Sequence, residues 1–263
     1  MNLAANPPLD VRLMNRGAAV LMLAFAMLVA LMGVRLLARW SAFDLQQIIV
    51  TGDSHHSNSA TLRANVAPHI AGTFFSVDLD RVRATFEAVP WVRAAVVKRE
   101  FPNRLHVVLQ EHQPVALWGG DGDARLLNSY GEIFEANVGE VDQDNLPTLS
   151  GPDSQASDVL AMYQGLAPLF SGTDTPLIQL RLSERGSWSA GLDGGATVEL
   201  GRGNLDEVRE RTRRLMLTVT QVAARYGRQP NTMEYADLRH ENGYAIRLRG
   251  VSTEQAVQAK QPK

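Results

Sequence analysis

The feature that most constrains this chain is an uninterrupted apolar run near its N-terminus. No charged residue occurs from Gly17 to Val34, a stretch of 18 residues. As a helix, this stretch would be about 27 Å long at roughly 1.5 Å per residue, close to the hydrocarbon thickness of a bilayer. The buried helix of a soluble protein is one alternative, but such helices are rarely apolar on every face over five turns. We therefore expect a membrane-spanning helix at residues 17–37, preceded by a short segment, residues 1–16.

A cleaved signal peptide is the second alternative for the same run. The apolar part of such a peptide usually spans about 7–15 residues and ends at a cleavage site of small residues. Here the run is longer, and the residues that follow it include Arg35, Arg39 and Trp40. We therefore expect an uncleaved anchor. Because two arginines precede the run and two follow it, charge alone leaves the orientation of the helix open.

The composition of the whole chain excludes several classes of protein. Of its 263 residues, 45% are hydrophobic and 21% are charged, which is too apolar for a disordered chain. It contains no cysteine, so disulfide scaffolds and thiolate metal sites are excluded. The formal net charge is −2, which gives no basic field for binding nucleic acid.

A first globular region is expected at residues 43–114, in the order β-α-α-β-β. Strands are predicted at 45–50, 92–97 and 105–109, and the residues Thr51 to Asp53 are expected to form a turn. Helices are predicted at 62–70 and 79–89, the second capped by Asp78 and ended by Pro90. In the strand 92–97, alternation places one set of side chains on one face and the other set opposite: Val92, Ala94 and Val96 against Arg93, Ala95 and Val97. Both helices are expected to cover one face of the three-stranded sheet.

A second region, residues 115–250, is richer in strands. We expect a hairpin at 126–134, a helix at 157–170 that Pro168 cuts short, and a long helix from Asn204 to Gly227 with a capping box. Further strands are predicted at 177–182, 188–192, 197–200, 233–238 and 244–248, the last two forming a hairpin around Asn242-Gly243. Being last, the strand 244–248 is expected at a sheet edge, followed by a disordered tail, residues 251–263. The fold class is therefore α+β.

No pattern in the sequence nominates a catalytic, cofactor-binding or metal-binding site. The glycines match no phosphate-binding loop, the six histidines lack metal-ligand spacing, and no G-x-S-x-G motif occurs. Pairs such as Glu207 with Arg211, and Glu210 with Arg214, explain the arginines at 209–214 without nucleic acid. A membrane-tethered hydrolase stays open as an alternative, because the members of a triad are distant in sequence. The main expectation is a tethered surface whose edge strand pairs with an incoming strand.

Several motifs together resemble the FtsQ/DivIB family of bacterial division proteins. The first is Pro90-Trp91-Val92 with Ala95, Val97, Arg99, Pro102 and Leu105, followed by Glu111, Pro114-Val115-Ala116 and Trp118. Further matches are Leu127-Asn128, Gly131-Glu132-Ile133-Phe134, Leu146-Pro147, Gly151-Pro152, Ser187-Trp188, Leu200-Gly201-Arg202, Asp237-Leu238-Arg239 and Asn242-Gly243. Their order covers nearly the whole chain from Phe43 to Arg249.

The resemblance implies an essential, non-enzymatic scaffold of the divisome that links early and late division proteins at the septum. It implies a cytoplasmic N-terminus, a single inner-membrane helix, a periplasmic POTRA domain and a periplasmic β domain. The β domain of the family captures the FtsB–FtsL pair by adding a strand of FtsB to its terminal edge. No cofactor, nucleic acid or small-molecule substrate is implied, although contacts with other divisome proteins are.

The resemblance also implies particular site residues. Arg239 and Arg185 match basic positions that meet an acidic residue of the partner. The rest of the expected partner-binding site is His240, Asn242, Gly243, Tyr244, Ile246 and Arg247, where His240 replaces the usual tyrosine. Val97 and Arg99 match POTRA positions linked to septal recruitment, although a core role for Val97 is at least as well supported. An outer-membrane assembly or secretion factor with a POTRA domain is the alternative, but such proteins usually carry a cleaved signal and a membrane barrel.

Overall fold

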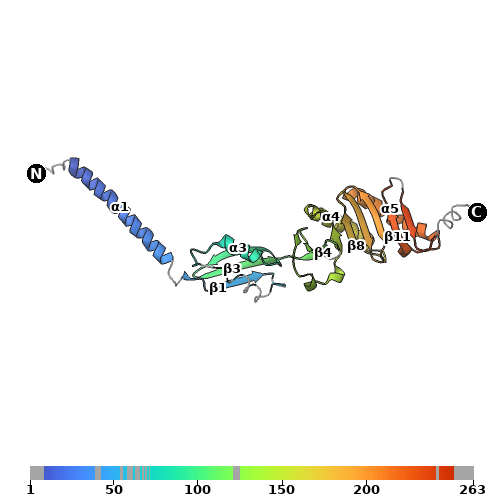
Figure 1. The fold of residues 1–263 in the computed structure, drawn as a ribbon, viewed down its shortest axis with the longest axis horizontal. Helices are drawn as coiled ribbons and strands as arrows, with labels where there is room; N and C mark the ends of the chain where they lie inside the picture. The colour runs from blue at the N-terminus through green and yellow to red at the C-terminus, as the bar shows by residue number, and fades with distance from the viewer. Residues whose placement is uncertain are drawn as a thin grey trace, which may run out of the picture. The chain divides into compact units, whose positions relative to one another are not determined.

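The computed structural model describes residues 9–38, 43–53, 56, 57, 62, 66, 68, 70, 72–120, 125–240 and 243–251. The chain divides into two compact units, Met1–Glu111 and His112–Lys263. The first unit contains helix α1 and a small three-stranded sheet, and the second contains a large sheet with two long helices (Figure 1). The α+β fold class expected from the sequence is confirmed.

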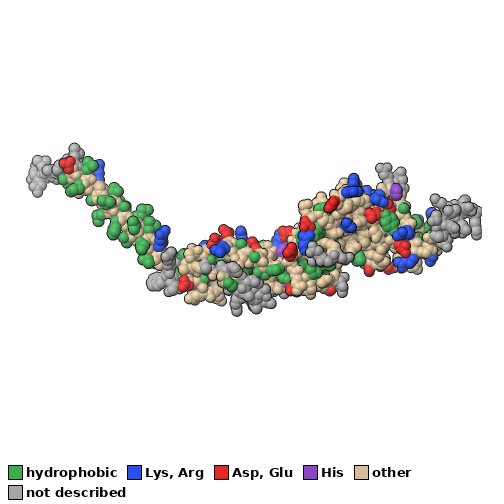
Figure 2. Space-filling view, viewed as in Figure 1, with side chains coloured by type: hydrophobic (Ala, Val, Ile, Leu, Met, Phe, Trp, Pro, Cys, Tyr) green, Lys and Arg blue, Asp and Glu red, His purple; other side chains and the backbone are tan. Residues whose placement is uncertain are grey.

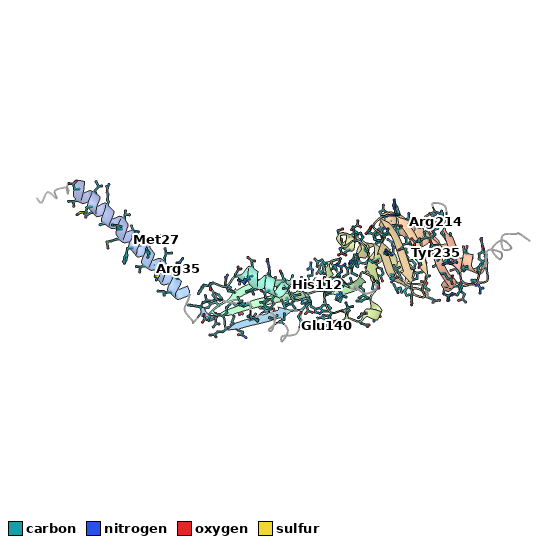
Figure 3. All side chains as sticks on the ribbon, in the orientation of Figure 1. Met27, Arg35, His112, Glu140, Arg214 and Tyr235 are labelled. Carbon is teal, nitrogen blue, oxygen red and sulfur yellow. The ribbon has the colours of Figure 1, made fainter. Side chains whose placement is uncertain are left out.

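Helix α1 is the apolar segment expected from the sequence. It extends from Leu9 to Ala38, so it includes residues 9–16 before the uncharged run as well as Arg35 after it. Within the described residues, Leu13–Leu36 is the one helical segment long and apolar enough to cross a membrane. Hydrophobic side chains are exposed along the segment (Figure 2). The side chains of Met27 and Arg35 project away from the helix axis (Figure 3). A helix exposed in this way needs an apolar environment from outside the chain.

The small sheet of the first unit has the strand order β1-β3-β2. Its elements are β1 Gln47–Gly52, α3 Leu79–Glu87, β2 Val92–Glu100 and β3 Arg104–Glu111. Strand β1 pairs in parallel with β3, and β2 pairs antiparallel with β3. The prediction of a turn at Thr51-Gly52 was wrong, because both residues pair with β3 and extend the first strand. Of the predicted helix 62–70, the described positions Leu62 and Val66 are helical and buried, and most of the others lie outside the described residues.

Helix α3 has the N-cap that the sequence predicts. The side chain of Asp78 accepts hydrogen bonds from the backbone N–H groups of Asp80 and Arg81, at 3.0 and 3.2 Å. These bonds satisfy donors that a helix N-terminus leaves unpaired. The helix ends at Glu87, before the predicted end at Val89, yet Val89 is still buried in the core of the first unit.

The predicted alternation of strand β2 was wrong. A β-bulge between Val92 and Ala94 shifts the register against β3, so the residues after it change faces. Ala95 is buried and Val97 packs against the core, whereas Val96 is 52% exposed. A bulge adds one residue to one strand, which reverses the alternation beyond it.

Within the described part of the second unit, the large sheet has nine strands in the order β12-β11-β10-β9-β8-β7-β4-β5-β6. The strands are β4 Pro114–Trp118, β5 Arg125–Asn128, β6 Ile133–Phe134, β7 Thr148–Ser150, β8 Leu177–Leu182, β9 Ser187–Leu192, β10 Thr197–Arg202, β11 Met233–Asp237 and β12 Ala245–Leu248. The helices are α4 Ala156–Phe170 and α5 Leu205–Ala224, with the short 3₁₀ turns η3 Val138–Glu140, η4 Gln143–Asn145, η5 Asp153–Gln155 and η6 Pro230–Thr232. The two helices pack against each other, and both share one apolar core with the sheet.

Helix α4 does not end at Pro168, contrary to the prediction. The helix continues to Phe170, and Pro168 lies inside its last turn. Leu166 and Phe170 are fully buried. Their burial holds this turn in place although proline lacks the backbone N–H that a helix interior uses.

Helix α5 has the predicted capping box, but its charged residues have different partners from those predicted. Asn204 accepts from the N–H of Glu207, and the Glu207 carboxylate accepts from the N–H of Asn204. With Glu207 occupied at the cap, the guanidinium of Arg211 donates instead to the carbonyl oxygen of Arg202. Glu210 pairs with Arg213, at 3.3 Å.

Two leucines on α5 test whether the buried stripe of this helix stabilises the sheet. Leu215 is fully buried, and Leu217 is 72% exposed. Leu215→Ala should lower the free energy of unfolding by about 2–5 kcal/mol, because it leaves a cavity under the sheet. Leu217→Ala should change it by less than about 0.5 kcal/mol. Chemical denaturation of the two variants measures both values, and equal losses would contradict the packing described.

Candidate partner-binding site

Strand β12 lies at one end of the nine-stranded sheet. It pairs antiparallel with β11, with Met233 opposite Leu248 and Asp237 opposite Ala245. Among the described residues, β11 is the one strand that pairs with it. The prediction that the last strand is an edge strand is therefore confirmed. An edge strand presents backbone N–H and C=O groups to an incoming chain.

The outward-facing backbone groups of β12 follow from its hydrogen bonds. The N–H of Arg249 donates to the carbonyl oxygen of Thr232, at 2.8 Å, so it faces the preceding strand. Backbone groups alternate in direction along a strand, so those of Ala245 and Arg247 also face β11, whereas those of Ile246 and Leu248 face outward. The Leu248 carbonyl oxygen accepts from the N–H of Val251 in a turn, at 3.3 Å. The backbone groups of β12 that face outward are therefore the N–H and C=O of Ile246 and the N–H of Leu248, which we call the backbone row of β12.

The side chains around β12 lie on two faces of the sheet. The Tyr244 hydroxyl is 2.7 Å from Oγ1 of Thr218 on α5, so this tyrosine joins the edge to the helix layer. Ile246 packs against the same core. Arg247 lies on the opposite face, with its guanidinium carbon 5.8 Å from the ring centre of Tyr235. Figure 3 shows Tyr235 on these C-terminal strands. The edge is therefore supported on one face and polar on the other.

Arg239, just beyond the end of β11, is held by its own carboxylate partner. Its Nε donates to Oδ1 of Asp237 at 2.8 Å and its Nη2 to Oδ2 at 2.5 Å, while its backbone N–H donates to Oδ1 at 3.0 Å. The hydrogen bonds and charge of Arg239 lower the pKa of Asp237 to about 2, and the carboxylate raises the pKa of Arg239. Asp237 is 8% exposed, but the Arg239 side chain is 57% exposed. A guanidinium has five N–H donors, so this pairing leaves donors that face solvent.

The second predicted arginine, Arg185, lies at the same end of the sheet as Arg239. It is exposed in the turn between β8 and β9. Ser187 at the start of β9 pairs with Arg202 at the end of β10, and β11 is parallel to β10. The stem of Arg239 lies over Gly201, where a Cβ would be 3.1 Å from Cγ of Arg239. These pairings bring to one end of the sheet two arginines that are distant in sequence.

Comparison with known proteins identifies the family. Residues 43–112 match the sequence profile described as "POTRA domain, FtsQ-type", and residues 116–239 match that of "Cell division protein FtsQ/DivIB, C-terminal". A protein of Burkholderia pseudomallei named "Cell division protein FtsQ" is 40% identical over 243 residues, which cover 92% of this chain and 94% of the relative. Proteins of the same name from Thiomonas arsenitoxydans and Bordetella pertussis are 35% and 33% identical, and cover 93% and 95% of this chain and 89% and 96% of their own lengths.

The chain belongs to the FtsQ/DivIB family. The first unit therefore contains an FtsQ-type POTRA domain, and the second contains the C-terminal domain of cell division proteins. Helix α1 and the family together fit a single-pass inner-membrane division protein. The match to the C-terminal profile ends at Arg239, so strand β12 lies beyond it.

The other predicted site residues have different surroundings. His240 is exposed and Gly243 is half-buried, whereas Asn242 lies outside the described residues.

The POTRA residues Val97 and Arg99 lie on strand β2 of the first unit and not on strand β12 of the second. Arg99 donates from Nε to the carbonyl oxygen of Phe74 at 2.8 Å and from Nη2 to that of Val77 at 2.7 Å. Arg99 thus has a structural role that the sequence did not suggest.

Sequence reasoning missed three residues that shape the site. In the sequence, Asp237 had no role beyond its place in the Asp-Leu-Arg motif. An aspartate often accepts a hydrogen bond from the backbone N–H two residues later, which forms an Asx turn, and this was the available signal. Gly201 has φ of +80° and lies under Arg239, at a register shift within β10, and a glycine inside a strand is a weak signal for such a close approach. Thr218 supports Tyr244 across 26 residues, and no local pattern predicts this contact.

The acid–base behaviour of Asp237 gives a test of the Arg239 pairing. Its pKa is about 2, below the value of about 3.9 in unfolded chains, so the unfolded state binds more protons between about pH 4 and 2. The stabilisation is present above about pH 4 and is lost as the pH falls through this range. Asp237→Asn should lower the melting temperature at pH 7 and reduce the further decrease between pH 4 and 2.5. Asp193→Asn, in an exposed turn, is the control, and an unchanged profile in Asp237→Asn would contradict the pairing.

Proposed function

We propose that this protein is a scaffold of the divisome whose β domain captures the FtsB–FtsL pair by adding a strand of FtsB to β12. The observation that carries the proposal is the position of β12 at the sheet edge, with β11 as its partner among the described residues. Backbone groups of Ile246 and Leu248 face outward there, and an added strand would satisfy them. The core packing of Ile246 and the Tyr244–Thr218 contact hold the edge in an extended conformation before a partner arrives. Preorganisation of this kind lowers the entropic cost of binding.

Charge at the end of the sheet supports the same proposal. Arg239 is oriented by Asp237 and still offers donors to solvent, and Arg185 lies at the same end. We expect an acidic residue of FtsB to meet these arginines. Because the arginines are exposed, such contacts would fix the register of the added strand and speed association more than they raise affinity. His240, Asn242, Gly243 and Arg247 would complete the partner-binding surface.

The same proposal includes the topology of the chain. Residues 1–16 would lie in the cytoplasm and residues 17–37 in the inner membrane. The POTRA domain, residues 43–114, and the β domain, residues 115–250, would lie in the periplasm, followed by the tail 251–263. Val97 and Arg99 would contribute to septal recruitment, Arg99 by holding the segment between Phe74 and Val77 in place. We propose a binding role without catalysis.

Replacing Ile246 tests strand addition directly. Ile246→Pro removes an outward N–H, and proline is tolerated in edge strands where the N–H faces solvent. Ile246→Ala is the matched control, since it loses the same side chain and keeps the N–H. We expect Ile246→Pro to weaken binding of the purified FtsB–FtsL pair at least tenfold relative to Ile246→Ala, with equal melting temperatures. Equal affinities of the two variants in a calorimetric titration would exclude strand addition at this position.

Replacing Arg239 tests the electrostatic part of the proposal. Arg239→Ala should lower the association rate for FtsB–FtsL about tenfold at low ionic strength, and the difference from wild type should shrink with added salt. Arg209→Ala removes the same charge from the exposed face of α5 and should change the rate by less than about twofold. Stopped-flow measurements at several salt concentrations give these rates. If the two variants behaved alike, Arg239 would have no specific part in the encounter.

A further inference from the structure

Three phenylalanines form a cluster at one end of the POTRA domain, which we call the aromatic tip: the half-buried Phe43 and the exposed Phe75 and Phe101. Phe75 is 52% exposed and Phe101 is 71% exposed. The ring centres of Phe43 and Phe75 are 5.0 Å apart, in an edge-to-face arrangement. The buried Phe74 joins the cluster, with its ring centre 5.2 Å from that of Phe75 and 6.0 Å from that of Phe101. Singly exposed apolar residues need no explanation, but a connected aromatic cluster at a surface indicates a partner.

Hydrogen bonds join the backbone segments that carry the rings of the aromatic tip. The N–H of Phe74 donates to the carbonyl oxygen of Phe43 at 2.7 Å. Arg99 holds the carbonyl oxygen of Phe74 from the neighbouring strand β2. The N–H of Gln46 donates to the carbonyl oxygen of Asn103 at 3.0 Å, which joins the β2–β3 turn to the start of the domain. The rings are therefore presented from a fixed base, which lowers the entropic cost of docking.

The covalent connection to α1 limits how far the aromatic tip can be from a membrane. Helix α1 ends at Ala38, and its apolar segment ends at Leu36. Phe43 follows Ala38 by five residues, which span at most about 18 Å when fully extended. Phe43 is itself a member of the tip, so the other two rings share this limit. The tether gives the tip a high effective concentration at any bilayer that α1 crosses.

We propose that the aromatic tip inserts into the interfacial layer of the phospholipid bilayer that α1 crosses. Aromatic and aliphatic side chains favour this layer, where an apolar ring leaves water without entering the hydrocarbon centre. The charges near the tip are balanced, with Asp44 and Glu100 against Arg99 and Arg104. Insertion therefore depends on the rings and not on anionic lipid. The inference rests on α1 as a membrane anchor and is independent of FtsB capture.

The absence of cysteine from the chain allows a site-specific test on the full-length protein. A fluorophore on Glu100→Cys would report from beside Phe101. A fluorophore on Asp53→Cys would report from the opposite end of β1, about 20 Å away at roughly 3.3 Å per residue. Asp53 is exposed, and its N–H pairs with the carbonyl oxygen of Leu109. Both labelled proteins would be reconstituted into phosphatidylcholine vesicles that contain phospholipid with a spin label at the headgroup.

We expect quenching at position 100 to be at least twice that at position 53. Phe75→Ser with Phe101→Ser should reduce quenching at position 100 to the level of position 53, while the melting temperature stays the same because both rings are exposed. If the double variant fails to fold, Phe101→Ser alone should still reduce quenching by half.

Three results would overturn the inference. Equal quenching with and without the two phenylalanines would show that the tip does not enter the membrane. A signal that falls as the protein-to-lipid ratio is lowered would instead assign the tip to contact with a second copy of the chain. If the protein stays with the vesicles in alkaline carbonate, either of these two results would overturn insertion of the tip while α1 would still be a membrane anchor. Loss of the protein from the vesicles in carbonate would overturn the anchor as well.

Discussion

The crossover from β10 through α5 to β11 is the constraint on which the candidate site depends. Helix α5 buries Val208 and Leu215 completely against the sheet, so the chain returns beside β10 and β11 pairs with it in parallel. After that crossover, the short connection beyond β11 leaves one place for β12, on the outer side of β11. The same pairing brings the end of β11 beside Gly201 at the end of β10, which places Arg239 at the end of the sheet where Arg185 also lies. The packing of α5 against the sheet thus determines both which strand lies at the edge and where the charge of Arg239 is placed.

Three arginines around this edge, Arg239, Arg247 and Arg249, are paired within the chain before any partner binds. Asp237 orients Arg239, and Glu234 lies within 3.5 Å of Arg247 and 3.2 Å of Arg249. Such pairs contribute little to stability at an exposed surface, but they restrict where each guanidinium points. In our proposal, the arginines guide the partner and the backbone row of β12 holds it. The aromatic tip belongs to the other unit, so the two proposals depend on separate residues and can fail separately.

Much of the fold could be predicted from the sequence, since local signals and burial agree in most elements. The caps at Asp78 and Asn204 were correct, and most strands of the second unit were predicted close to their observed positions, but β4 and β7 were not predicted. The errors occur where tertiary packing overrides a local rule. Burial of Phe170 carries α4 past Pro168, and a bulge in β2 reverses the faces of the residues after it. No residue type marks such a bulge, because it depends on the register with β3.

The sequence by itself determined the apolar helix, the order of the elements, the family and the arginines to consider at the candidate site. These features depend on residue type and on spacing along the chain, which a sequence displays directly. The tertiary structure alone decided that Arg239 is held by Asp237, that Arg99 ties two carbonyl groups, and that Phe43 contacts Phe75 while Phe101 joins them through Phe74. Each of these contacts depends on how the backbone brings side chains together, and the last two join residues at least 22 positions apart. Contacts of the last two kinds are set by packing and hydrogen bonding across elements, which have no fixed spacing in sequence.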